Sequence, residues 1–248
     1  MPRWRFFVFC SRSNLCYDRT LTHVKEYFSR RILRNTQRLA TDSPAREAIM
    51  ADSRNRIAEF LRETNRLIQA LDQNAIDKAR RALLDCYRRR GRIFTFGNGG
   101  SASTAQHFAC DLAKYIIPEG GWPFDVRCLT DNVALYTAWA NDAARDEVFV
   151  NQLRGLLTSN DAVIAISVHG GNGCSVDLVR AVQFANNVGA ATVSLVGFDG
   201  GVLGRVSSCP VLVPVHSTPQ TEAIHLVIEH LLIHLLKEDL ANGAQGEN

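Results

Sequence analysis

The 248-residue sequence has no long hydrophobic run, no closely spaced cysteine pair and no strong excess of either charge. No apolar stretch approaches the ~20 residues of a membrane-spanning helix, so no transmembrane segment is expected. The seven cysteines form no Cys-x-x-Cys pair, which argues against a zinc knuckle or a dithiol redox site and favours reduced thiols. A net charge of only +3 gives no indication of nucleic acid binding.

What is present is the composition of a globular protein, with 46% hydrophobic and 21% charged residues. Residues 1–49 contain ten Lys/Arg and four Asp/Glu, a net charge of +6, so the rest of the chain carries −3. We interpret residues 1–49 as a basic extension outside the fold, 50–241 as one domain and 242–248 as a frayed tail. Because Met50 directly precedes the first amphipathic pattern, translation from Met50 is an alternative hypothesis, and a basic transit peptide is another.

From residue 52 onward, short apolar runs alternate with helical patterns. Strands are predicted at 93–96, 126–129, 162–166, 191–195 and 211–215. Helices are predicted at 52–71, 76–90, 102–117, 132–140, 147–157, 175–188 and 219–240. Strands joined by crossover helices form a parallel sheet with right-handed connections. The sequence therefore predicts one α/β domain with a five-stranded parallel sheet, two leading helices and a long C-terminal helix.

Two glycine-rich turns follow buried strands of this predicted sheet. The first is Gly97-Asn98-Gly99-Gly100-Ser101, and the second runs from Ser167 to Gly173. Each turn leads into a helix and places free backbone N–H groups at the carboxyl edge of the sheet, which favours a phosphorylated small molecule. The first turn also matches the GxGxxG/A dinucleotide pattern, which expects an acidic residue about 20 positions later, at the end of the next strand. The nearest candidate at such a strand end is Asp131, which lies further away. Nicotinamide binding is therefore the weaker alternative.

Imidazole and carboxylate side chains recur at helical spacing on two predicted helices. His107 and Asp111 are four residues apart on the helix after the first turn, so they share a face. The closing helix carries two further pairs: Glu222 with His230, and His225 with Glu229. A single histidine is more often structural, but polar groups on otherwise apolar helices are uncommon. This combination suits a divalent metal or acid–base chemistry.

Three ordered segments, GNGGSASTAQHFACDL, TAWAND and STPQTEAIHLVIEHLL, resemble the phosphoheptose isomerase branch of the SIS (sugar isomerase) domain family. The resemblance extends from about residue 52 to residue 240. It implies a flavodoxin-like, doubly wound sheet and a homotetramer with active sites shared between subunits. It further implies conversion of sedoheptulose 7-phosphate to D-glycero-D-manno-heptose 7-phosphate with a divalent metal, usually zinc.

The resemblance also assigns roles to individual residues. The implied metal ligands are His107, Asp111, Glu222 and His230, with Asp111 as the base and His230 as the acid. The implied substrate contacts are Asn98, Gly99, Gly100, Ser101, Asn141, Asp142, Ser167, Val168, His169 and Glu222.

This chain departs from the family pattern at three positions. Asp111 replaces a glutamate and is one methylene shorter, while Glu222 replaces a glutamine and adds a negative charge. In the second turn, Ser167 is retained, but His169 stands where the family's phosphate-binding loop has a serine.

Two alternatives to the heptose isomerase stay open. One is a non-catalytic SIS module that binds a sugar phosphate or a protein partner, as regulatory relatives do. The other is an isomerase of a different sugar phosphate, which the altered second turn suggests. In every case we expect a cytoplasmic protein with a phosphorylated sugar as its ligand, and neither nucleic acid nor membrane as a partner.

Overall fold

The structure, a computed structural model, describes residues 43–117 and 121–243. The chain forms two compact units, and the boundary between them in the sequence falls between Leu61 and Arg62. Helix α2 (Ser43–Gln69) begins within the predicted extension and continues without a break through Met50. In the first unit, its large apolar side chains are exposed at Ile49, Met50, Ile57, Phe60 and Leu61. The predicted boundary at residues 49/50 therefore falls inside a helix and stays a prediction. The rest of the extension and residues 244–248 lie outside the described residues.

The second unit is built on a five-stranded parallel sheet, which confirms the predicted fold class. Its strands are β1 (Arg92–Gly97), β2 (Asp125–Cys128), β3 (Ala162–Ser167), β4 (Ala191–Gly197) and β5 (Cys209–Val213). They lie in the order β2-β1-β3-β4-β5, and every neighbouring pair is parallel. The order reverses direction between β1 and β3, which is where ligands bind in open α/β sheets.

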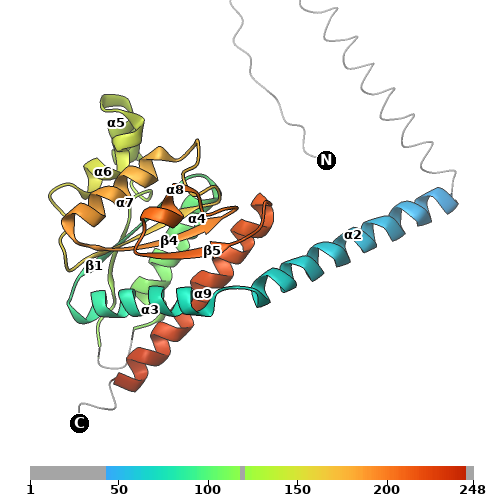
Figure 1. Cartoon of the computed structure of the whole chain (residues 1–248), viewed down its shortest axis with the longest axis horizontal. Coiled ribbons are helices and arrows are strands. Elements are labelled where there is room, and N and C mark those ends of the chain that lie inside the picture. Colours follow the sequence, from blue (N-terminus) through green and yellow to red (C-terminus); the bar gives the residue numbers. More distant parts are fainter. Residues whose placement is uncertain (1–42, 118–120, 244–248) are drawn as a thin grey trace, which may run out of the picture. The chain divides into compact units, whose positions relative to one another are not determined.

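Helices cover both faces of this sheet because successive strand residues point to opposite sides (Figure 1). One face packs against α3 (Gln73–Arg88), α4 (Gly100–Cys110) and α9 (Thr218–Gly243). The other packs against α6 (Val148–Leu153), α7 (Val176–Val188) and α8 (Gly201–Val206). On β1, Ile93 belongs to the first core and Phe94 to the second, and both are fully buried.

Helices α4 and α9 lie on the same face, and the core fixes both of them. Phe108 of α4 and Ile228 and Leu232 of α9 are fully buried in the first core. The Thr95 hydroxyl on β1 donates a hydrogen bond of 2.8 Å to the Ala105 carbonyl and joins α4 to the sheet. The polar side chains between the two helices are thereby held by a rigid, well-packed scaffold.

Three details differ from the predicted elements. The helix predicted at 102–117 changes at Asp111 into a π-helical turn, Asp111–Tyr115. The short helix α8 was not predicted, because the glycines at its first and fourth positions weaken the helical pattern. Strand β5 begins two residues earlier than expected, at Cys209. Within the described ranges, no helix combines the length and apolarity needed to cross a membrane.

Candidate functional site

The first glycine turn connects β1 to α4, and its backbone conformation and surroundings disfavour any residue with a side chain. Gly99 has φ of +56°, in the left-handed region that favours glycine. A Cβ atom on Gly100 would collide with the Glu222 carboxylate, which approaches from the first turns of α9. Glu222 is thus half-buried at the mouth of the turn. The structure brings Gly100 and Glu222 together, as expected for two residues assigned to one substrate site.

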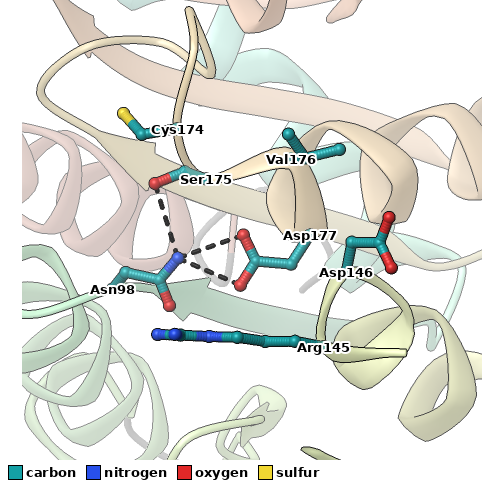
Figure 2. A pocket seen from close by; sticks show the side chains of 7 residues that line it. All are labelled: Asn98, Arg145, Asp146, Cys174, Ser175, Val176 and Asp177. Carbon is teal, nitrogen blue, oxygen red and sulfur yellow. Dashed lines mark hydrogen bonds between the residues drawn. The ribbon is translucent and has the colours of Figure 1, made fainter. Parts of the chain in front are cut away.

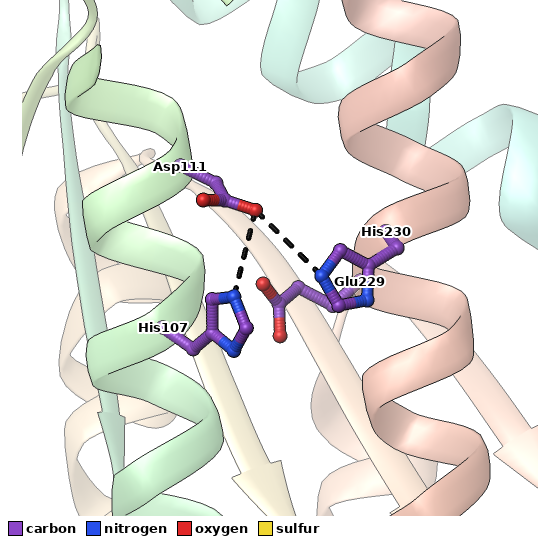
Figure 3. Close-up of side chains that lie close together, drawn as sticks. All are labelled: His107, Asp111, Glu229 and His230. Atoms are coloured by element: carbon purple, nitrogen blue, oxygen red, sulfur yellow. Dashed lines mark ion pairs between the residues drawn. The ribbon is translucent and has the colours of Figure 1, made fainter. Parts of the chain in front are cut away.

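Four metal-ligating side chains converge between α4 and α9: His107, Asp111, Glu229 and His230. One ligand atom from each lies within 4.8 Å of the others (Figure 3). The Asp111 Oδ2 atom is 3.7 Å from His107 Nε2 and 3.8 Å from His230 Nε2. The two imidazole rings meet edge to face, with centroids 4.9 Å apart. Three of the four metal ligands implied by the resemblance therefore lie together, and Glu229 is the fourth member of the cluster in place of Glu222.

Local backbone geometry contributes to this convergence. Asp111 is the first residue of the π-helical turn, and such turns are frequent at functional sites because they re-aim side chains relative to a regular helix. On α9, His230 Nδ1 lies 3.0 Å from the Leu226 carbonyl oxygen. When Nδ1 donates a proton to that carbonyl, Nε2 presents its lone pair to the centre of the cluster.

The four side chains differ in burial. His107 and His230 are 44% and 51% exposed, whereas Asp111 is 19% exposed. Glu229 is completely buried. Burial, with the nearby Asp111 carboxylate as a second cause, raises the pKa of Glu229 to about 8. The cluster is therefore open to solvent on its histidine side and closed on its Glu229 side.

The second glycine turn follows β3 and packs tightly against the loop after β4. Ser167 and Val168 are buried, whereas His169 is exposed and its ring lies 4.5 Å from that of Phe198. Gly170 has φ of +59°, and a Cβ atom there would lie 2.1 Å from the Gly200 carbonyl oxygen. Glycine is required at this position by both its backbone conformation and its surroundings.

A cavity of about 410 Å³ lies between the first glycine turn and the residues that directly follow the second (Figure 2). Its lining residues are Asn98, Arg145, Asp146, Cys174, Ser175, Val176 and Asp177. The Asn98 amide donates hydrogen bonds of 3.1 and 3.0 Å to the two carboxylate oxygens of Asp177, which is buried at the start of α7. This contact ties the end of β1 to the segment after β3, so the cavity occupies the reversal point of the sheet.

Of the seven residues that line the cavity, sequence reasoning identified only Asn98 as a site residue. Most of the predicted substrate contacts lie outside both the cavity lining and the four-residue cluster: Gly99, Gly100, Ser101, Ser167, Val168, His169 and Glu222. Arg145, from the short helical turn η2 (Arg145–Glu147), brings a positive charge to the cavity, and no pattern in the sequence marks it. Asp177 resembles an ordinary first-turn acid of a helix. Asn141 and Asp142 lie exposed at the end of α5 (Val133–Asp142) and belong neither to the cluster nor to the cavity lining.

Comparisons with known proteins agree with this architecture. Residues 59–197 match the family model of the SIS domain. The phosphoheptose isomerase of Halorhodospira halophila is 36% identical over 202 residues, which cover 79% of this chain and 100% of that protein. The lincomycin biosynthesis protein LmbN of Streptomyces lincolnensis is 35% identical over 184 residues, which cover 71% of this chain and 66% of that protein.

The same resemblance is found among solved structures. The structure of phosphoheptose isomerase GmhA from Neisseria gonorrhoeae superposes with a TM-score of 0.66 at 27% sequence identity, covering 75% of this chain and 98% of that one. A phosphoheptose isomerase from Francisella tularensis shares the fold, with a TM-score of 0.69 at 24% identity.

Proposed function

The chain belongs to the SIS domain family, and on that premise we propose that it is a metal-assisted isomerase that converts sedoheptulose 7-phosphate to D-glycero-D-manno-heptose 7-phosphate. The observation that carries this proposal is the cluster of His107, Asp111, Glu229 and His230 between α4 and α9. A module that only binds a sugar phosphate does not need two imidazoles and two carboxylates at mutual contact distance.

The reaction moves one proton between adjacent carbons and one between adjacent oxygens. A base takes a proton from C1 of the ketose while O2 is protonated, which gives an enediol. The O1 hydroxyl then loses its proton and C2 gains one, which gives the aldose. We assign the C1 proton to the Asp111 carboxylate and the oxygen proton to the His230 imidazole. Both side chains are partly exposed and 3.8 Å apart, so one substrate edge can meet both of them.

The donor set fits a divalent cation, for which zinc is our proposal. Two imidazole nitrogens and two carboxylates are ligands that zinc accepts in proteins. When bound, such an ion supplies Lewis-acid polarisation of the substrate carbonyl. His107 contributes by holding its Nε2 atom toward the same point as His230 Nε2, with Asp111 between them (Figure 3).

We assign the phosphate end of the substrate to the glycine turns at the carboxyl edge of the sheet. Backbone N–H groups of the turns and the Ser101 hydroxyl supply donors, and Arg145 adds a positive charge. In this proposal the first turn and the start of α9 form one wall of the phosphate site, through Asn98, Gly99, Gly100 and Glu222. The second turn forms the other wall, through Ser167, Val168 and His169. Asn141 and Asp142 are retained only as predicted contacts.

A homotetramer with shared active sites, and a cytoplasmic location, also remain predictions. The exposed apolar side chains are what supports the assembly. On α5 no residue is buried, and Val133 and Leu135 are 66% and 42% exposed. On α9, Val227 and Leu231 are 39% and 37% exposed. Apolar faces of this kind are common where subunits meet.

The test is incubation of the purified chain with sedoheptulose 7-phosphate, with and without a chelator, followed by product analysis. We expect heptose 7-phosphate only when metal is present. Asp111→Asn and His230→Ala should each lower kcat by about 10²- to 10⁴-fold. His234→Ala is the matched control, because His234 is on the same helix but pairs with the exposed Glu238.

The possible results separate the alternatives. Wild-type rates in either variant reject the role of that residue. Absence of product under every metal condition, with retained sugar phosphate binding, supports the non-catalytic module. Turnover of a different sugar phosphate, and not of the heptose, supports the second alternative.

A further inference from the structure

We propose that Glu229, rather than Glu222, supplies the second carboxylate of the divalent-cation site, together with His107, Asp111 and His230. This inference rests on the proposed metal-assisted function and changes the ligand set that the family resemblance implies. Glu229 precedes His230 in the sequence, and its side chain points from α9 into the space between the helices (Figure 3).

The first support is the distance between ligand atoms. Metal–ligand bonds of ~2.0–2.2 Å in tetrahedral geometry place neighbouring ligand atoms about 3.4 Å apart. The Asp111 Oδ2 atom is 3.7 Å from His107 Nε2 and 3.8 Å from His230 Nε2, so both of these distances are already near that spacing. A Glu229 oxygen completes the group within 4.8 Å of all three atoms.

The second support is that the Glu229 carboxylate is buried and has no hydrogen-bond partner in the described part of the chain. The side chain is fully buried, and neither oxygen has a hydrogen-bond partner among the described residues. Buried carboxylates normally have hydrogen-bond partners, an opposite charge or a metal, because burial without any of these is costly. The buried His225, one turn earlier on α9, makes no hydrogen bond to Glu229. The side chains grouped with Glu229 between the helices are another carboxylate and two imidazoles that can bind metal. A bound cation would satisfy all four groups together.

The third support is that Glu222 has a different place. It lies two helical turns before His230, against the backbone of Gly100, and is only half-buried. There it faces the first glycine turn, where the proposed substrate enters, and it is not one of the four mutual neighbours. The aspartate at position 111 is consistent with this assignment. Its side chain is one methylene shorter than the family's glutamate and reaches less far from α4, so a carboxylate on α9 can approach the same point.

The test uses the full chain, stripped of metal with a chelator and titrated with Co²⁺, whose visible absorption reports its ligands. The variants are Glu229→Gln and Glu222→Ala, with Glu238→Gln as a matched control for loss of a carboxylate from α9. Alanine is used at position 222 because a glutamine there could itself bind the metal. Outer partners of metal ligands typically change affinity 10- to 100-fold, so loss of a direct ligand should weaken binding by more than about 100-fold. We expect that loss, and an altered absorption band, in Glu229→Gln, and wild-type affinity and spectrum in the other two.

Several results would overturn the inference. Wild-type Co²⁺ affinity in Glu229→Gln refutes it, and an equal loss in Glu222→Ala refutes the exclusion of Glu222. If the metal-free Glu229→Gln chain fails to fold by circular dichroism, Glu229→Asp replaces it. That variant keeps the charge but retracts the carboxylate, so its spectrum must change if Glu229 is a ligand. A wild-type chain that isomerises the heptose without binding Co²⁺ or Zn²⁺ refutes the ligand assignment and leaves the isomerase activity standing.

Discussion

The buried imidazole of His225 permits a quantitative prediction about acid stability. Burial lowers the pKa of His225 from its usual value of 6.5 to about 4, because the charged form is poorly solvated in the core. The nearby Val196 backbone opposes part of this shift, but neither buried ring nitrogen has a hydrogen bond of full geometry among the described residues. Between pH 6.5 and 4 the unfolded chain therefore binds a proton that the folded chain does not. Stability contributed by the neutral imidazole is present above pH 6.5 and is lost as the pH falls toward 4.

The magnitude follows from the size of this shift. Each pKa unit corresponds to about 1.4 kcal/mol, so the full loss approaches about 3 kcal/mol at pH 4. About 2 kcal/mol of it should already be lost between pH 7 and pH 5. Glu229 has the opposite pH dependence, because its pKa of about 8 keeps it protonated in the folded metal-free protein while the unfolded chain releases that proton. The His225 contribution is therefore isolated only by comparison with a variant that keeps Glu229.

The assay compares wild type with His225→Leu, which has a similar volume and no titrating group. Urea unfolding of both metal-free proteins is followed at pH 7, 6 and 5. At pH 7 the two should be similar, or the variant more stable, because two unpaired nitrogens have been removed from the core. At pH 5 the variant should gain about 2 kcal/mol relative to wild type. Parallel pH dependence of the two unfolding free energies would refute the reasoning.

Two further predictions concern the glycine turns. Asn98→Ala removes the donor to the buried Asp177 carboxylate and should lower the free energy of unfolding by about 2 kcal/mol, measured by chemical denaturation; an unchanged value would show that this contact does not hold the turns together. Gly170→Ala places a Cβ atom against the Gly200 carbonyl and should raise KM for the sugar phosphate and destabilise the fold by more than about 1 kcal/mol. Gly155→Ala is its control, since it has the same left-handed conformation but open space around it, and equal effects in both would contradict the role of the close approach.

Much of the fold could be predicted because its signals are local. The apolar runs that became β1, β3 and β4 are fully or nearly fully buried, as expected of parallel strands covered on both faces. The exceptions have local causes as well. The π-helical turn at Asp111 leaves the sequence pattern of a helix unchanged, and only its side-chain directions differ.

The candidate site could be predicted only in part, because it depends on which helices meet. Spacing alone placed His107 with Asp111 and showed that Glu222 and Glu229 each share a helix with His230. It could not decide which of the two glutamates joins His107 and Asp111, since that depends on the rotation of α9 in the core. Arg145 could not be predicted as a site residue for the same reason. Its position at the cavity depends on the packing of η2 against α7, and it belongs to no sequence motif.

The contact between α4 and α9 has a consequence for the lifetime of the protein. About half of the chain separates His107 from His230, yet the two rings touch. An ion bound there would cross-link two segments that are distant in the sequence, and it would bind only the folded form. Unfolding then has to include release of the ion, so at an ion concentration 100 times Kd the folded form gains about 2.7 kcal/mol. Metal supply would thereby set how quickly proteases clear the chain, as well as how fast it turns over substrate.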